Sequence, residues 1–354
     1  MKIFLVIPTL KQGGAERVMS ELANNFDDIG HEVHFILLAE ADDFYAINPT
    51  IQVHRLGFKN KGIIQKKTSE LNTFIKLRVL LNTERPDAVL CFMEKYNILT
   101  LLASRFLNLK VFVSDRSNPF KKLSLSIEIL RRLTYGFAAG IVAQTKVAQE
   151  KLAYTTNHKN IRIISNPVRE IKQFSNINKE KIIINVGRMV PEKGQKYLIE
   201  AFSKLNQQDW KLVILGDGAL RTDLENQIEK LGLKEQVFMP GSVKNVDEWL
   251  AKASIFAFPS ISEGFPNALV EAMAAGLPCV SFDCPAGPIE IIINGYNGIL
   301  VDSKDANALK QEMKVLCDNE ENRNALGEKA TEIKEHLNPQ KIALQYIEFF
   351  ESVN

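Results

Sequence analysis

The stretch Ser260–Pro278, SISEGFPNALVEAMAAGLP, decides the fold of this 354-residue chain. It follows an apolar run, residues 253–259, that predicts a buried parallel strand. The Gly-Phe-Pro at 264–266 breaks the chain into a loop. Residues 268–275 favour a helix with Asn267 as its N-cap, and the glycine and proline that close the stretch end that helix. The sequence therefore predicts a strand, a loop and a helix N-terminus in succession.

This arrangement predicts a binding site with two kinds of polar group. The first amides of a helix lack partners within the helix and, together with the helix dipole, favour an anion such as phosphate. Glu263 lies in the loop and Glu271 about one turn into the helix. Because a phosphate repels carboxylates, we expect both to accept hydrogen bonds from sugar hydroxyls. The alternative is a pair of ordinary surface charges.

A second polar loop follows the apolar strand predicted over residues 181–186. It runs from Gly187 to Gly194, GRMVPEKG, and places Arg188 and Lys193 five positions apart at a strand end. Two cations in such a loop can grip a diphosphate and stabilise it as it leaves. The alternative is a solvated charged loop.

The first strand, residues 2–8, is also followed by a loop that could meet a ligand. Gly13 and Gly14 precede a helix predicted over residues 15–26, and glycine lets the backbone approach a bound molecule closely. The pattern is not Gly-x-Gly-x-x-Gly, which disfavours a nicotinamide-dependent enzyme. An ordinary turn is the alternative.

Together these motifs resemble those of family 4 of the retaining glycosyltransferases, which have the GT-B fold. The first glutamate is followed by Gly-Phe-Pro, and the second lies eight positions after the first, as in that family's signature. Gly187-Arg188 and Lys193-Gly194 are similar to its diphosphate-binding motif, and Gly13-Gly14 to its first loop. The resemblance extends over nearly the whole chain and is densest over residues 187–298.

The resemblance implies transfer of a hexose or N-acetylhexosamine from a nucleotide diphosphate sugar, with retention of the anomeric configuration. UDP is the expected carrier because uridine is the commonest base in the family. Glu263 would contact the sugar near its reacting carbon, and Glu271 would hold the ribose. The implied catalytic residues are Glu263, Arg188, Lys193 and Arg116. The implied donor-binding residues are Gly13, Gly14, Val243, Gly264, Phe265, Pro266, Asn267, Leu269 and Glu271.

Arg116 is where the chain departs from many relatives, which place a histidine near this strand end. It follows a strand predicted over residues 111–114. An arginine cannot act as a base because it stays protonated, but it can clamp a phosphate or orient the acceptor. The alternative is a salt bridge to Asp115 or another acid.

No metal and no cofactor are expected. The sequence contains no Asp-x-Asp, so Arg188, Lys193 and the helix amides would neutralise the diphosphate. By resemblance, the leaving phosphate would itself accept the proton of the acceptor hydroxyl, on the same face of the sugar.

Strands alternate with helices through the chain, which predicts an α/β protein with parallel sheets covered on both faces. The resemblance implies two Rossmann-like domains facing across a cleft. Residues 1–168 would bind the acceptor, residues 169–336 would bind the nucleotide sugar, and residues 337–354 would form a helix that crosses back to the first domain. The polar segment 170–181 is the predicted linker.

The two halves carry opposite charge. Residues 1–167 hold 23 Lys and Arg against 15 Asp and Glu, whereas residues 168–354 hold 21 against 27. The cations of the first half gather in two amphipathic regions, which predicts binding to an anionic membrane surface. Alternatively, the apolar stripes pack on the core and the cations are solvated. These cations are Lys59, Lys61, Lys66, Lys67, Lys76, Arg78, Lys121, Lys122, Arg131 and Arg132.

We therefore expect a peripheral enzyme at the cytoplasmic face of the membrane that extends a polyprenyl-diphosphate-linked saccharide in bacterial surface-glycan assembly. No apolar run reaches the roughly 18 residues of a membrane span. The four cysteines include no Cys-x-x-Cys pair and are expected to be reduced thiols. No nucleic-acid partner is expected. The alternatives are a sugar-nucleotide epimerase of the same fold and a nucleotide-sugar-binding protein without catalytic activity.

Overall fold

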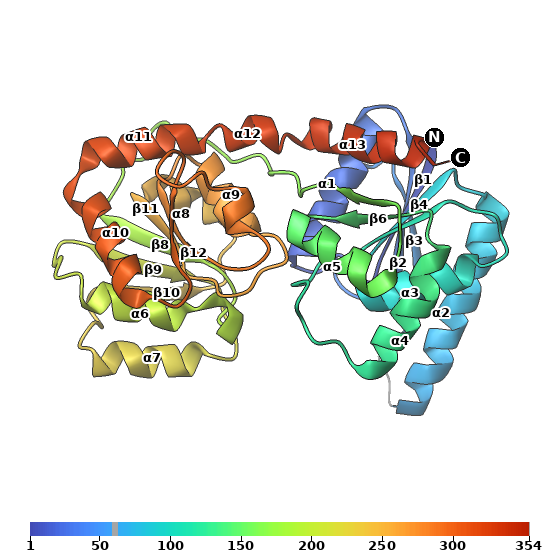
Figure 1. The fold of residues 1–354 in the computed structure, drawn as a ribbon, viewed down its shortest axis with the longest axis horizontal. Coiled ribbons are helices and arrows are strands. Elements are labelled where there is room, and N and C mark those ends of the chain that lie inside the picture. Colours follow the sequence, from blue (N-terminus) through green and yellow to red (C-terminus); the bar gives the residue numbers. More distant parts are fainter. Residues whose placement is uncertain (59–62, 354) are drawn as a thin grey trace. The chain divides into compact units, whose positions relative to one another are not determined.

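The computed structural model describes residues 1–58 and 63–353, with the side chains of these residues except 58 and 63–68. The chain divides into two compact units (Figure 1). The first comprises Met1–Pro167 together with Leu337–Asn354, and the second comprises Val168–His336. We describe each unit separately.

The first unit contains, within the described residues, a seven-stranded parallel sheet in the order β3-β2-β1-β4-β5-β6-β7. Its strands are β1 (Lys2–Ile7), β2 (Glu32–Ala39), β3 (Gln52–Phe58), β4 (Ala88–Phe92), β5 (Val111–Ser114), β6 (Gly140–Ala143) and β7 (Ile161–Ile163). Its helices are α1 (Gly14–Asp28), α2 (Ile63–Glu84), α3 (Glu94–Ser104), α4 (Leu125–Thr134), α5 (Lys146–Thr156) and α13 (Pro339–Glu351).

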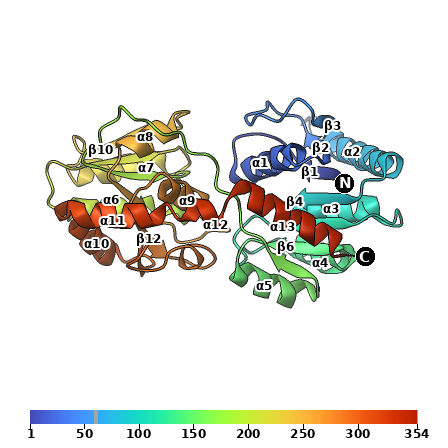
Figure 2. The same cartoon turned by 90° about the horizontal axis from the view of Figure 1, so that it is seen from above.

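The interior strand β1 shows why this sheet forms. Its residues from Ile3 to Ile7 are all buried, as expected for a parallel strand covered on both faces. The chain's last helix, α13, lies beside α1 (Figure 2). Its Phe349 and Phe350 rings pack on Phe112 of β5, with ring centroids 5.1 Å and 4.6 Å apart. This aromatic contact makes the C-terminal segment part of the first unit.

The second unit contains, in the residues described, a six-stranded parallel sheet in the order β10-β9-β8-β11-β12-β13. Its strands are β8 (Ile182–Val186), β9 (Lys211–Leu215), β10 (Val237–Gly241), β11 (Ile255–Phe258), β12 (Cys279–Asp283) and β13 (Ile299–Asp302). Its helices are α6 (Gln195–Ser203), α7 (Arg221–Lys230), α8 (Val246–Lys252), α9 (Asn267–Ala274), α10 (Ala306–Asp318), α11 (Glu320–Ala330) and α12 (Ile333–His336).

The strand order of the second unit positions a ligand site. The chain builds outward from β8 through β9 to β10, then returns to the other side of β8 to form β11, β12 and β13. The loops after β8 and β11 therefore leave neighbouring strands toward opposite faces of the sheet. In open α/β sheets, the crevice at such a switch point is where ligands bind. The loop after β8 carries Lys193, and the loop after β11 carries Glu263.

The predicted α/β architecture with parallel sheets is confirmed, with local differences in the helices. The helix predicted over residues 15–26 is α1, which begins one residue earlier and ends two residues later. The helix α5 is not among the predicted elements, because its short polar sequence shows little apolar periodicity. None of the helices among the described residues is long and apolar enough to cross a membrane.

Candidate active site

Lys193 and Glu263 form an ion pair at the carboxyl edge of the second sheet. Lys193 ends a short 3₁₀ turn, Pro191–Lys193, and its Nζ lies 2.6 Å from Oε1 of Glu263. The side chains are 21% and 7% exposed, respectively. Two residues 70 positions apart in sequence thus meet because β8 and β11 are neighbours in the sheet. A charge-assisted hydrogen bond in this partly desolvated setting is among the stronger polar contacts.

The loops that carry this pair pack tightly on one another. Gly194 adopts φ +65°, and a Cβ added there would lie 2.0 Å from the carbonyl oxygen of Pro259. The amide of Ile261 donates to the carbonyl of Glu192 at 2.9 Å. A side chain at position 194 would therefore both strain the backbone and push the Glu263 loop away from Lys193.

The helix α9 begins one residue earlier than its predicted cap implies. Pro266 occupies the N-cap position, where it makes no side-chain capping bond, and Asn267 is the first helical residue. The prediction of Asn267 as N-cap is therefore wrong. A proline suits this position because it has no N–H to leave unsatisfied. The Asn267 amide donates to the Phe265 carbonyl at 3.0 Å, so Ala268 and Leu269 supply the next amides at this helix end.

The other predicted donor-binding residues of this unit differ in exposure. Arg188 is exposed, and in the part of the chain that the structure describes no hydrogen bond or ion pair holds its guanidinium. Phe265 and Leu269 are buried, so a ligand would meet the backbone of Leu269 rather than its side chain. Gly264 lies between Glu263 and Phe265 in the loop. Val243 lies in the turn after the edge strand β10, and no described contact joins it to the Lys193–Glu263 pair.

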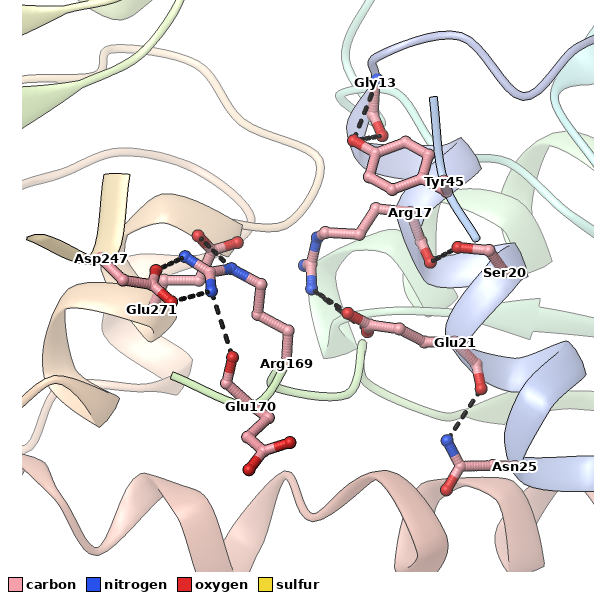
Figure 3. A network of polar contacts seen from close by, with 10 residues as sticks. All are labelled: Gly13, Arg17, Ser20, Glu21, Asn25, Tyr45, Arg169, Glu170, Asp247 and Glu271. Carbon is pink, nitrogen blue, oxygen red and sulfur yellow. Dashed lines mark hydrogen bonds and ion pairs between the residues drawn. The ribbon is translucent and has the colours of Figure 1, made fainter. Parts of the chain in front are cut away.

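Glu271 is held by an arginine that sequence reasoning missed. The Nε of Arg169 donates to Oε2 of Glu271 at 3.0 Å, and its Nη1 donates to Oδ2 of Asp247 at 3.0 Å (Figure 3). A second bond joins Nη2 to Oδ1 of Asp247. Burial opposes ionisation of Asp247, but hydrogen bonds from Arg169 and from the Lys172 amide outweigh it and lower the pKa of this carboxyl. The residues come from α8, α9 and the segment that opens the unit.

In the first unit, the predicted glycine pair lies at the start of α1, where Gly13 is the N-cap and Gly14 the first residue. The hydroxyl of Tyr45 donates to the Gly13 carbonyl at 3.0 Å and accepts from its amide at 3.3 Å (Figure 3). A Cβ added to Gly13 would lie 2.2 Å from Oε2 of Glu16. The Glu16 carboxylate thus covers the open side of Gly13, and a ligand approaching there would displace it.

Arg116 lies at the carboxyl end of β5 and is held by neutral partners. Its Nη1 donates to Oδ1 of Asn166 at 2.5 Å and its Nη2 to the Tyr346 hydroxyl at 2.9 Å. The guanidinium carbon lies 3.4 Å from the centroid of the Phe92 ring. Burial lowers the pKa of Arg116. This arginine therefore fastens α13 to the first sheet, and its proposed contact with phosphate or acceptor stays a prediction.

The alternative partner considered for Arg116, Asp115, is engaged elsewhere. Its Oδ2 lies 3.1 Å from Nη1 of Arg131, and its Oδ1 accepts from Asn97 at 3.1 Å and from Tyr135. Burial, and then the charge of Glu94, raise the pKa of Asp115 to about 6. Asp115 and Arg131 also line a small pocket in this unit. The remaining lining residues are Glu94, Ser117, Asn118, Pro119, Lys121, Leu123, Ala148, Lys151 and Leu152.

Two family models match adjacent parts of the chain. Residues 12–170 match the model described as Glycosyltransferase Family 4. Residues 167–333 match the model described as Glycosyl transferases group 1. The two matches together extend over most of both structural units.

Curated relatives and solved structures agree with these models. The chain is 29% identical over 333 residues to a Campylobacter jejuni protein named GalNAc-alpha-(1->4)-GalNAc-alpha-(1->3)-diNAcBac-PP-undecaprenol alpha-1,4-N-acetyl-D-galactosaminyltransferase, covering 92% of this chain and 91% of the relative. It is 28% identical over 368 residues to N-acetylgalactosamine-N,N'-diacetylbacillosaminyl-diphospho-undecaprenol 4-alpha-N-acetylgalactosaminyltransferase of the same organism, covering 98% and 99%. The structure of Anabaena Alr3699/HepE in complex with UDP and glucose matches with a TM-score of 0.85 at 20% identity, covering 99% of this chain and 100% of that chain.

The motifs, the two parallel sheets and these matches lead to the same family. The likeness to the solved structures establishes the fold, and the family models and curated relatives identify the enzyme class. The chain belongs to family 4 of the glycosyltransferases and has the GT-B fold.

Proposed function

We propose that the protein transfers a hexose or N-acetylhexosamine, with retention, from UDP-sugar to a polyprenyl-diphosphate-linked saccharide in bacterial surface-glycan assembly. The observation that carries this proposal is the Lys193–Glu263 pair at the switch point of the second sheet. It puts a cation and a carboxylate beside a helix N-terminus, which suits a diphosphate joined to a sugar.

Each group of this site has a proposed role. Lys193, Arg188 and the first amides of α9 neutralise the diphosphate as it leaves, without a metal ion. Glu263 accepts a hydrogen bond from the donor sugar near its reacting carbon. The Lys193 ammonium, already in contact with Glu263, sits between that carboxylate and the diphosphate and limits the repulsion between them.

The proposed transfer keeps the anomeric configuration because both bonds change on one face of the sugar. The bond from the anomeric carbon to the diphosphate breaks, and the acceptor oxygen attacks from the side on which the diphosphate leaves. The acceptor proton passes to a diphosphate oxygen. This route needs no carboxylate nucleophile, which fits a site whose nearest carboxylate, Glu263, is paired with Lys193.

The proposed acceptor rests on the names of the two Campylobacter relatives, both of which contain an undecaprenol-linked diphosphate. Transfer of label from UDP-sugars into a lipid extract tests this reaction. A sugar-nucleotide epimerase would leave the label in the nucleotide, and a protein that only binds would leave the donor unchanged.

We also propose that the first unit lies against the anionic inner face of the cell membrane. The helices α2, α3 and α4 pack in that order. Exposed apolar side chains lie along α4, with Leu125 72% and Leu133 64% exposed. We call the exposed side chains of these three helices, together with Lys121 and Lys122 just before α4, the α2–α4 surface. Its exposed apolar residues are Leu71, Ile75, Val79, Leu102, Leu125, Ile129, Leu130 and Leu133.

The charges of this surface differ in part from the predicted set. Lys76, Lys121, Lys122 and Arg132 are exposed. Arg131 is instead paired with Asp115, and Arg78 donates to the carbonyls of Ala103 and Arg105. Leu77, which lies between Lys76 and Arg78 in α2, is buried in the core. Lys59 and Lys61 lie outside the described residues, and Lys66 and Lys67 outside the described side chains. Basic residues beside an exposed apolar stripe suit an anionic leaflet.

Liposome flotation tests the membrane proposal. Wild-type protein should float with vesicles containing anionic lipid at low salt and should be released as salt screens the attraction, since each surface cation adds about 1 kcal/mol. The variants Lys121→Glu/Lys122→Glu and Leu125→Ser/Leu133→Ser should each lose most of this binding. Lys230→Glu/Lys234→Glu, an equal charge change on exposed residues of the second unit, is the matched control and should float normally. The proposal would be contradicted if flotation did not depend on the charge of the lipid, or if the control variant lost as much vesicle binding as the other two variants.

A further inference from the structure

We propose that Arg169 is a positioning residue for donor recognition, which orients the Glu271 carboxylate toward the ribose hydroxyls. This inference rests on the proposed function, because it takes nucleotide diphosphate sugar as the ligand and Glu271 as its ribose contact. It assigns a role to a residue outside the sequence motifs, in the segment that opens the second unit.

The geometry of the guanidinium supports this role. Both terminal nitrogens of Arg169 bond to the two oxygens of Asp247 in a parallel pair, and Nη1 also donates to the Glu170 carbonyl at 3.1 Å. A paired contact of this kind fixes the plane of a guanidinium. The direction of the Nε–H is then fixed as well, and it points to Oε2 of Glu271 (Figure 3). Asp247 is itself held by the Lys172 amide at 3.0 Å.

Burial makes this arrangement specific rather than incidental. The side chains of Arg169, Asp247 and Glu271 are 22%, 13% and 14% exposed. Ion pairs on an exposed surface reorganise freely, whereas three partly buried groups with shared bonds hold one geometry. Lysine cannot replace arginine here, because a single ammonium cannot present one N–H to Glu271 and a parallel pair to Asp247.

The charge of Arg169 also has a chemical consequence. An ionised carboxylate only accepts hydrogen bonds, so it selects hydroxyl groups that donate, such as those of a ribose. A diphosphate bound at the N-terminus of α9 would repel the Glu271 carboxylate in the same helix. The adjacent guanidinium counters that repulsion. The alternative is that Arg169 competes with the ribose for Glu271. In that case, removing Arg169 would tighten the binding of UDP rather than weaken it.

Nucleotide binding by the full-length protein tests the inference. Calorimetry would give the dissociation constants of UDP and of 2′,3′-dideoxy-UDP, which lacks both ribose hydroxyls. Wild-type protein should prefer UDP. Arg169→Ala should weaken UDP binding roughly tenfold, as expected for a residue coupled within one network. It should leave binding of the dideoxy analogue nearly unchanged, so the preference for UDP shrinks.

A double-mutant cycle with Glu271→Gln separates positioning from independent contact. The double variant should bind UDP no more weakly than Glu271→Gln alone, because Arg169 acts through Glu271. Asp247→Asn should also weaken UDP binding, as Arg169→Ala does. This variant tests the inference if Arg169→Ala folds poorly. The matched control is Arg323→Ala, which removes a half-buried arginine of the same unit that bonds to the Leu316 and Cys317 carbonyls. It should leave both dissociation constants unchanged.

The outcomes distinguish this inference from the proposed function. If wild-type protein binds UDP but Arg169→Ala binds it as tightly or more tightly, the positioning role is wrong and the proposed function stands. Additive losses in the double variant would also overturn it. If wild-type protein binds no nucleoside diphosphate, the proposed function fails and the inference fails with it.

Discussion

Replacing Glu263 by glutamine is expected to lower kcat by two to three orders of magnitude while changing donor affinity much less. The glutamine keeps the size of the side chain but removes the charge that we propose contacts the sugar as the bond to the diphosphate breaks. Loss of one preorganised polar contact of this kind costs about 2–4 kcal/mol of transition-state stabilisation, or roughly 10²–10³ in rate. Steady-state kinetics with separate determination of kcat and donor KM measures the effect.

The matched control for this variant is Glu200→Gln. Glu200 is an exposed carboxylate of α6 that pairs with Lys204, so its replacement makes the same chemical change away from the sheet edge. The control should retain wild-type kinetics. A Glu263→Gln enzyme with near wild-type kcat would rule out the assignment of the sugar contact to this residue.

Removal of Lys193 is expected to produce the second large effect. Lys193→Ala should raise the donor KM and lower kcat by roughly 10²-fold, because in the proposed reaction the leaving diphosphate loses a counter-charge in a partly desolvated site. It should also lower the melting temperature, since Glu263, 7% exposed, is left without its partner. Adding Glu263→Gln should restore part of that stability but not the activity.

Comparison with two other cations sharpens this prediction. Arg188→Ala should raise the donor KM with little change in melting temperature, because the Arg188 side chain is exposed. Lys196→Ala removes an exposed lysine three residues beyond Lys193 and should leave kinetics and stability unchanged. If Lys193→Ala lowers stability but not kcat, the ion pair is structural and the diphosphate must be neutralised by other groups.

The sequence alone could predict most of this architecture because its parallel strands are short apolar runs. The run that forms β5 is predicted over residues 111–114, the bounds that the structure gives it. The sequence also places Lys193 and Glu263 each in a loop at a strand end. The structure then shows that the two strands are adjacent, which brings the two side chains together. Local patterns suffice where a fold rule brings strand ends together.

Contacts made by individual side chains across long sequence separations could not be predicted in this way. Arg169 lies 102 positions from Glu271, and Arg116 lies 230 positions from Tyr346. No periodicity or spacing links such residues, and their partners depend on how whole helices pack. The only sequence signal for Arg169 is its place at the junction between the two units. For the same reason, the sequence could not show that Arg131, which is predicted as a surface cation, is paired with Asp115.

The most direct test of the account is the product formed from a labelled UDP-sugar and a polyprenyl-diphosphate-linked saccharide in the presence of EDTA. We expect a labelled lipid whose new glycosidic bond has the same anomeric configuration as the donor, as determined by NMR, with UDP released in equal amount. Formation of this product in EDTA would support neutralisation of the diphosphate by Arg188, Lys193 and the α9 amides. An inverted linkage, an epimerised nucleotide sugar without transfer, or a loss of activity in EDTA that magnesium restores would contradict the account.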